Sequence, residues 1–337
     1  MPDAPVIAAR QGRIGHLLLD RAGALNALDL GMIRAIRAAL DSWRLDPSVH
    51  AVVIEGAGPR AFCAGADIRA LRALMLAGAH EDVAAFFREE YALNAAIARY
   101  PKPYVALIDG ICMGGGIGVS VHGRIRVTTE SGLFAMPETA IALFPDVGTT
   151  HILSRLPGAL GMFLGLTGQR LAGADAVHAG LATHFVPRTS LAALRDSLAA
   201  EGVAAVAAFA ETLPPFSLAP HRAAIDRCFS APTLAGVLAA LAAEAAADPW
   251  TGETLATLRA HSPSALSWTF AALRRGACLE LEAALAAELA LTGPVTRHPD
   301  FAEGVRAMVV DKDRAPRWSP PTVEAVNPDL IEAMLRA

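Results

Sequence analysis

Long uncharged hydrophobic runs are missing from this sequence, although 53% of its 337 residues are hydrophobic. The longest candidate, Ala231 to Ala243, is shorter than the ~18 residues that a membrane-spanning helix needs, and it is typical of a core helix. The opening residues, MPDAPVIAARQGRIG, also lack the basic start and apolar core of a secretory signal peptide. We therefore expect a globular chain with no membrane partner.

An excess of charge of either sign is also missing, since 29 basic residues stand against 33 acidic ones and the net charge is −4. This balance excludes the strongly basic surface that nucleic acid attracts, so we expect no nucleic-acid partner. Cysteine is scarce, and its four copies lie far apart with no CxxC pair: Cys63, Cys112, Cys228 and Cys278. Scattered cysteines are typical of reduced packing residues, so we expect a cytoplasmic protein.

Several motifs that identify common enzyme classes are absent. The sequence has no P-loop, no GxGxxG at the proper spacing after a strand and no HExxH, and its histidines are scattered, so we expect no metal. The segment 118–123, GVSVHG, misses GxSxG by one residue, which removes the nucleophile elbow of serine hydrolases. Ser120 is then a small packing residue, and catalysis must use other groups.

Strand-like and helix-like segments alternate up to about residue 190, which favours an α/β fold. The remainder is rich in alanine and leucine, is interrupted at prolines and predicts helices almost throughout. We therefore predict two domains, with an α/β core over residues 1–200 and a helical region over 201–337. The segments that predict strands are 13–19, 51–55, 104–108 and 181–187, and those that predict long helices before residue 190 are 30–44 (capped by Asp29), 68–77 and 81–99.

Residues 103–148 form the stretch around which the chain is organised. A predicted strand leads to three consecutive glycines at 114–116, which open a small apolar segment. N–H groups at the start of a helix have no partner inside it, and they can receive an anion or a developing oxyanion. Downstream, Glu138 directly follows a proline and Asp146 lies eight residues later. The pattern indicates an acyl-transfer site, or else packing glycines followed by two helix-capping acids.

Two further segments add candidate residues. The segment 60–68, RAFCAGADI, is a second small-residue stretch that opens a predicted helix. The segment 86–91, FFREEY, places Glu89 beside Glu90 on another predicted helix. Adjacent acids on a helix are typical of a solvated face, so a functional role for either acid competes with that simpler interpretation.

Taken together and in order, the segments RAFCAGADI (60–68), GICMGGGIG (110–118) and MPETAIALFPDVG (136–148) resemble the enoyl-CoA hydratase/isomerase, or crotonase, superfamily. A further set of matches resembles its thioester-hydrolase branch and extends the similarity over about residues 10–335: FFREEY (86–91), SVHG (120–123), GLATHFV (180–186) and DFAEGVRAMVVDKDRAPRW (300–318). The resemblance implies a crotonase-like spiral of ββα turns followed by a helical C-terminal region that packs on it. It also implies an acyl-CoA substrate, no separate cofactor because coenzyme A is part of that substrate, and a possible homo-oligomer, either trimer or hexamer.

The resemblance also assigns roles to particular residues. Ala66 and Gly115 fall where the superfamily places its two backbone oxyanion-hole donors, and Glu138 falls on the catalytic glutamate. Asp146 falls where the hydrolase branch carries an aspartate and hydratases carry glycine, whereas Gly118 stands where hydratases place a second catalytic glutamate. The expected substrate-binding residues are Glu90, Gly114, Asn26, Ala64, Asp67 and Ile68.

The activity that this resemblance implies is hydrolysis of the thioester of 3-hydroxyisobutyryl-CoA, or of a related short 3-hydroxyacyl-CoA, a step of valine catabolism. Glu138 would act either as nucleophile or as general base, and Asp146 would assist it. An enoyl-CoA hydratase or isomerase is the first alternative, because the two carboxylates would also serve such a reaction. A catalytically silent acyl-CoA-binding protein is the second, and retention of both carboxylates argues against it.

Overall fold

The computed structural model describes residues 5–336, and these residues form two compact units. The unit that we call the sheet unit comprises the chain up to Asp67, Glu89–Ala135 and Arg170–Ser217, and the helical unit comprises Ile68–Arg88, Met136–Gln169 and the chain from Leu218 onward. This division differs from the predicted boundary at residue 200. The reason is that two segments before residue 170, Ile68–Arg88 and Met136–Gln169, pack with the C-terminal helices.

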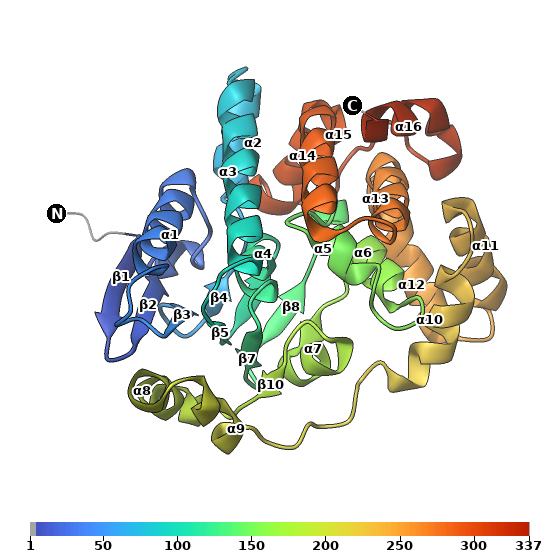
Figure 1. Ribbon diagram of the computed structural model, residues 1–337. Helices are drawn as coiled ribbons and strands as arrows, with labels where there is room; N and C mark the ends of the chain where they lie inside the picture. Colours follow the sequence, from blue (N-terminus) through green and yellow to red (C-terminus); the bar gives the residue numbers. More distant parts are fainter. Residues whose placement is uncertain (1–4, 337) are drawn as a thin grey trace. The chain divides into compact units, whose positions relative to one another are not determined.

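A six-stranded sheet dominates the sheet unit (Figure 1). Its first two strands pair antiparallel, and every later neighbour pairs parallel. The predicted strands at 13–19, 51–55 and 104–108 are confirmed, the last predicted strand shrinks to two residues, and β1 was missed because only its first residue is buried. In spatial order the strands are β1 (Val6–Gln11), β2 (Ile14–Leu19), β3 (Ala51–Gly56), β5 (Tyr104–Ile108), β7 (Ile125–Thr128) and β10 (His184–Phe185).

A second sheet of four short strands completes a repeating pattern. The chain forms a strand of the six-stranded sheet, then a strand of the four-stranded sheet, then a helix or 3₁₀ turn, and it does so three times in succession. This repetition is the ββα spiral that the sequence predicted. The second sheet contains β4 (Ala61–Cys63), β6 (Ile111–Met113), β8 (Leu133–Ala135) and β9 (Leu171–Ala172), and the three turns end in α2 (Ile68–Leu76), α4 (Gly115–Val121) and the 3₁₀ turn η2 (Glu138–Ile141).

The core of the sheet unit lies against the six-stranded sheet. Leu194 and Leu198 of α8 pack with Ile14, Val53 and Val105 of three neighbouring strands. Each such side chain stabilises the fold by ~1.5–3 kcal/mol when it leaves water. The helices of this unit are α1 (Leu30–Trp43), the second half of α3 (His80–Ala98), α4, α7 (Gly173–Ala179), α8 (Leu191–Glu201) and α9 (Val206–Phe209).

The helical unit contains no strand among its described residues, as predicted for the C-terminal region. Besides α2 and the first half of α3, the helices are α5 (Thr149–Leu153), α6 (Leu160–Thr167), α10 (Arg222–Phe229), α11 (Leu234–Glu244), α12 (Pro249–Ala260), α13 (Pro263–Gly276), α14 (Leu281–Arg297), α15 (Pro299–Val305) and α16 (Pro328–Arg336). Helices α11, α12, α13 and α15 begin at a capping side chain; Ser262 of α13, for example, accepts a hydrogen bond from the N–H of Ala265 at 3.1 Å. No helix in the described part of the chain is long and apolar enough to cross a membrane.

Candidate active site

Two backbone amides lie side by side in the sheet unit, at Ala66 and Gly115. The N–H of Leu28 donates to the carbonyl of Gly65 at 2.8 Å and the N–H of Asp67 donates to the carbonyl of Leu28 at 2.8 Å, so the parallel bridge uses the groups on either side of the Ala66 amide. The nitrogen of Ala66 lies 3.5 Å from the point that a Cβ on Gly115 would occupy. Within residues 5–336, no group accepts a hydrogen bond from either amide. Two adjacent free donors are the arrangement that an oxyanion hole requires.

Gly115 is required by the close approach of other groups. A Cβ at this position would lie 2.4 Å from Oε1 of Glu90 and 3.3 Å from a methyl carbon of Leu28. The residue before it, Gly114, is buried and has φ +50°, a conformation that favours glycine, and it precedes the first turn of α4. Glycine at 115 thus leaves room for the side chains of Glu90 and Leu28, and glycine at 114 allows the positive φ that precedes α4.

Glu90 and Glu89 have opposite surroundings although they are neighbours on α3. Glu89 forms an exposed ion pair with Arg34 at 2.7 Å, whereas Glu90 is only 1% exposed and its carboxylate lies against Gly115. Burial raises the pKa of the nearby Cys63 thiol to about 12, and the charge of Glu90 adds to this effect. The solvated-face interpretation thus holds for Glu89, and Glu90 belongs to the surroundings of the amide pair.

The side chain of Asn26 is fully used inside the sheet unit. Its Oδ1 accepts from the N–H of Arg21 at 2.9 Å, and its Nδ2 donates to the carbonyls of Ala57 and Ala61, both at 2.9 Å. Asn26 itself is completely buried and has φ +54°. These bonds hold the 24–28 loop in a conformation that most side chains disfavour, so a role of Asn26 toward a substrate would pass through the loop backbone.

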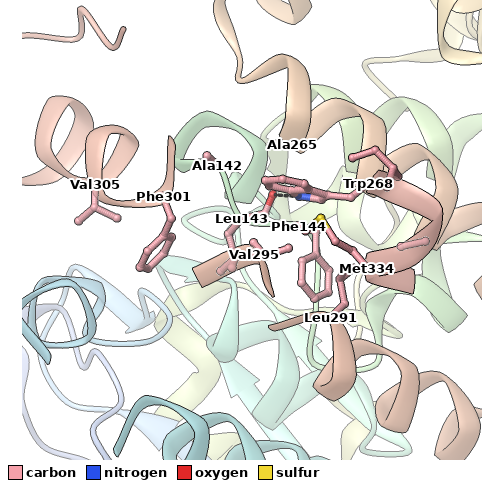
Figure 2. Close-up of a cluster of buried hydrophobic side chains, with 12 residues drawn as sticks. Ala142, Leu143, Phe144, Ala265, Trp268, Leu291, Val295, Phe301, Val305 and Met334 are labelled. Atoms are coloured by element: carbon pink, nitrogen blue, oxygen red, sulfur yellow. Dashed lines mark hydrogen bonds between the residues drawn. The ribbon is translucent and has the colours of Figure 1, made fainter. Parts of the chain in front are cut away.

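Asp67, Ala64 and Ile68 likewise form contacts within their own units. The Asp67 carboxylate accepts from the Arg21 guanidinium at 3.0 Å, and the N–H of Ala64 donates to the carbonyl of Leu25 at 3.0 Å. Ile68 opens α2 in the helical unit and packs against the hydrophobic cluster of Figure 2. Asp67 and Ala64 therefore shape the segment that presents the Ala66 amide.

The C-terminal signature segment braces α2 within the helical unit. Arg69 donates to the carbonyl of Val309 at 2.6 Å, and Arg72 donates to the carbonyl of Ala302 at 2.9 Å. The sequence match at 300–318 thus marks a structural support for the helix that follows the AGAD segment.

Glu138 begins the short turn η2 and is 6% exposed. The next residue, Thr139, is buried and donates to the carbonyl of Leu166 at 3.1 Å, and its Oγ1 lies 3.0 Å from Nδ1 of His261. Burial lowers the pKa of His261, which favours a neutral imidazole there. The turn ends at Ala142, with φ +54°. These contacts fix the backbone that carries the Glu138 carboxylate.

The chain between the two carboxylates is embedded in the core of the helical unit. Figure 2 shows Leu143 and Phe144 among the large side chains of the C-terminal helices, and the indole N–H of Trp268 donates to the carbonyl of Leu143 at 3.0 Å. A Cβ at Gly304 of α15 would lie 2.7 Å from the carbonyl carbon of Ile141. The C-terminal helices therefore set the position of η2 and of the segment after it.

Asp146 is 5% exposed and precedes a strained turn. Its backbone carbonyl accepts from the N–H and Oγ1 of Thr149, at 2.9 and 2.7 Å. Val147 and Gly148 both have positive φ, +54° and +83°. For a buried, β-branched valine that conformation is strained, so surrounding contacts must hold the turn.

One buried acid that the sequence analysis missed, Glu288 of α14, lies at this turn. Its carboxylate accepts from the N–H of Gly148 at 2.6 Å, from the N–H of Thr150 at 3.1 Å and from the Thr150 hydroxyl at 2.5 Å. Burial raises the pKa of Glu288 to about 8, and the charge of Asp146 adds to the rise while the hydrogen bonds oppose it. The available signal was its position three residues after the buried Leu285, on the core face of a helix.

The ββα spiral of the two sheets is the fold of the crotonase class of acyl-CoA enzymes. A family model described as enoyl-CoA hydratase/isomerase matches residues 14–335, and the chain belongs to this family, whose members act on acyl-CoA substrates.

The relatives carry two kinds of description. A curated "3-hydroxyisobutyryl-CoA hydrolase, mitochondrial" from Xenopus tropicalis is 45% identical over 98% of this chain and 88% of its own length. A solved structure described as a carnitinyl-CoA dehydratase from Mycobacterium thermoresistibile has a TM-score of 0.94 at 40% identity and covers 99% of this chain and 96% of its own. Another, described as an enoyl-CoA hydratase from Rhodobacter sphaeroides, has a TM-score of 0.92 at 42% identity, covering 98% and 97%.

These relatives contradict the expectation of a cytoplasmic protein. The curated relatives from frog, rat and human are all named mitochondrial, so that prediction is wrong and the names point to the mitochondrion. The inference failed because scattered free thiols indicate only a reducing environment, and they do not distinguish one reducing compartment from another.

Proposed function

We propose that this chain hydrolyses the thioester of 3-hydroxyisobutyryl-CoA, or of a related short 3-hydroxyacyl-CoA, to the free acid and coenzyme A in valine catabolism. The observation that carries the proposal is near-full-length similarity, at 43–45% identity, to curated hydrolases of that name. Coenzyme A enters as part of the substrate, and the reaction needs only water and groups of this chain.

We propose that the free N–H groups of Ala66 and Gly115 bind the thioester carbonyl oxygen. Negative charge develops on that oxygen when a nucleophile attacks, and preorganised amides stabilise it without having to reorient. Removing one such donor typically raises the barrier by about 3–4 kcal/mol. The adjacency of the two amides, 3.5 Å from one nitrogen to the other residue's Cβ position, supports this role.

Glu138 is proposed as the group that opens the thioester. Its carboxylate either attacks the carbonyl carbon, so that the C–S bond breaks and water then hydrolyses the resulting anhydride, or it takes a proton from the attacking water. Asp146 orients the water or the substrate hydroxyl, or delivers a proton to the departing thiolate. Both carboxylates are at least nine-tenths buried, and water exclusion strengthens each of these interactions.

A thiol-release assay tests the proposal against the alternatives. Purified protein is given a panel of short 3-hydroxyacyl-CoA and enoyl-CoA thioesters, and both free thiol and enoyl absorbance are followed. Thiol release that is fastest with 3-hydroxyisobutyryl-CoA is the expected result. Loss of enoyl absorbance without free thiol would establish a hydratase, which the descriptions of two solved relatives make the second candidate. Tight binding without turnover would establish a binding protein.

Glu138→Gln is the matching variant, because it keeps the size of the side chain and removes its charge. Thiol release should fall by at least ~10³-fold, since a nucleophile or base is lost, while circular dichroism and thermal unfolding stay close to those of the unmodified protein. Hydrolysis near the unmodified rate would exclude Glu138 as the catalytic group.

We also propose that the chain forms a homo-oligomer, either a trimer or a hexamer, on the basis of the family resemblance. Light scattering coupled to size-exclusion chromatography measures the mass directly. A mass close to the 35.1 kDa of one chain would contradict this proposal.

A further inference from the structure

The turn that follows Asp146 is a strained segment next to a proposed catalytic group. Two successive residues, Val147 and Gly148, have left-handed backbone conformations, and Val147 is completely buried. Strain of this kind persists only where neighbouring contacts over-determine the backbone, and it gathers at functional sites. The contacts that hold this turn are therefore candidates for a functional role.

Glu288 supplies contacts from a distant part of the chain. Its two carboxylate oxygens receive three hydrogen bonds, from the amide of Gly148 and from the amide and hydroxyl of Thr150, on the residues that directly follow the strained turn. Glu288 is 2% exposed, and its own helix is anchored in the core, where Figure 2 shows Leu291 and Val295 of α14 in the hydrophobic cluster. The turn is thus tied to a rigid element.

We infer that Glu288 is a positioning residue for thioester hydrolysis, which holds the strained turn so that the Asp146 carboxylate stays in its reactive placement. The inference rests on the proposed function. Glu288 does not need to touch the substrate, because it acts on the backbone that carries Asp146. An acid side chain suits this task in both of its forms. The ionised carboxylate accepts hydrogen bonds from all three donors, and the protonated form keeps acceptor capacity on both oxygens and can give its own proton to the Thr150 hydroxyl oxygen.

Glutamine cannot reproduce this arrangement. Its amide has one acceptor oxygen and one NH₂ group, so one of the two backbone N–H groups would face another donor. Aspartate is one methylene shorter and would withdraw from the turn. Glu288→Gln therefore keeps the volume of the side chain and loses the pattern of acceptors.

The closing experiment is a double-mutant cycle between Glu288→Gln and Asp146→Asn, measured as kcat and KM for thiol release from 3-hydroxyisobutyryl-CoA. Glu288→Gln alone should lower kcat by about 10- to 100-fold with KM changed little, because small misplacements of a catalytic group reach ~10²-fold in rate. In the Asp146→Asn background the same change should have almost no further effect on kcat. Glu280→Gln removes an exposed acid that makes no capping bond at the start of α14, and it should leave kcat unchanged.

An unchanged kcat in Glu288→Gln, or an equal fall in the Asp146→Asn background, would overturn the inference, since a merely structural contact would act independently of Asp146. Thr150→Val provides a milder test if Glu288→Gln fails to fold, because it removes only the hydroxyl bond at 2.5 Å. It should lower kcat by roughly 3-fold, the effect of one weak hydrogen bond, and only when Asp146 is present; equal loss in both backgrounds would overturn the inference. Failure of the proposed function has a different signature, which is an unmodified protein that releases no thiol at all.

Discussion

The sheet unit and the helical unit fix their proposed reactive groups by different physical means. In the sheet unit the groups are backbone amides, held by strand pairing and by a glycine against which Glu90 packs. In the helical unit they are carboxylates on a 3₁₀ turn and a strained turn, held by core side chains and by one buried acid. Backbone donors tolerate most side-chain substitutions nearby, whereas carboxylates on irregular segments depend on distant packing. The comparison predicts where substitutions lower activity. In the sheet unit these positions lie in the segments that carry the amides, and in the helical unit they lie far along the chain from the carboxylates.

Among substitutions in the sheet unit, the largest effect is expected at Gly115. In Gly115→Ala the new Cβ would lie 2.4 Å from the Glu90 carboxylate and beside the Ala66 amide, and it would obstruct the place of the carbonyl oxygen. Thiol release should fall by about 10²–10³-fold, the usual loss for one oxyanion-hole donor. Gly23→Ala is the control, because nothing lies within 4 Å of its Cβ position. A Gly115→Ala enzyme with nearly full kcat would disprove the assignment of the amide pair.

The second effect concerns the stability of the helical unit and follows from the pKa of Glu288. The folded protein keeps this proton up to a pH of about 8, whereas the unfolded chain releases it near the ordinary value of 4.5. Between these values the folded state binds more protons than the unfolded state, so the unfolding free energy falls as pH rises. The fall that this group contributes is on the order of a few kcal/mol.

Urea denaturation at pH 5 and pH 8.5 measures that fall in three proteins: the unmodified chain, Glu288→Gln and Glu280→Gln. The slope with pH should shrink in Glu288→Gln and persist in Glu280→Gln, whose acid is exposed. Identical slopes in all three would show that burial and the Asp146 charge do not hold the proton on Glu288.

A third prediction tests whether α15 holds the turn η2 in place, through a substitution at Gly304 of α15. In Gly304→Ala the new Cβ would meet three backbone atoms of Ile141 at 2.7–2.8 Å, so the turn that carries Glu138 must shift. Overpacking of this kind destabilises by about 1–3 kcal/mol, and the displaced carboxylate should lower kcat by roughly 10-fold. Gly293→Ala is the matched control, since its nearest neighbour is a flexible arginine at 3.7 Å. Equal behaviour of the two variants would show that α15 does not set the position of η2.

The same contrast explains what the sequence could and could not predict. Strands β2, β3 and β5 and the cap of α1 at Asp29 follow from local apolar patterns and capping chemistry, and they were predicted closely. The small-residue segments indicated N–H groups at the start of a helix, and the family resemblance assigned the pair to Ala66 and Gly115. The support of the carboxylates was not predicted, because Glu288 lies 140 residues from Gly148 in the chain and no local pattern records that contact.

Helix α14 shows most clearly what a sequence pattern cannot predict. Leucine recurs every four residues along α14, at 281, 285 and 289, which is typical of a core face. The structure instead buries Ala284, Leu285 and Glu288 and leaves Leu289 at the margin. A charged residue is normally placed on the solvent side of such a helix, and only its three hydrogen-bond donors, which come from another segment, make its burial possible. A pattern along one helix cannot reveal those donors.

The smallest expected effect contrasts two neighbouring acids on α3. Glu90→Gln removes a buried charge beside Gly115 and should raise KM for 3-hydroxyisobutyryl-CoA by about 3- to 10-fold, the range of one lost hydrogen bond to a substrate. Glu89→Gln breaks the exposed ion pair with Arg34 and should leave kcat, KM and the melting temperature unchanged, because exposed pairs contribute little. Steady-state kinetics of both variants, measured side by side, decides whether Glu90 contributes to substrate binding. If the two variants gave the same KM, burial against Gly115 would carry no functional weight and Glu90 would be a packing residue.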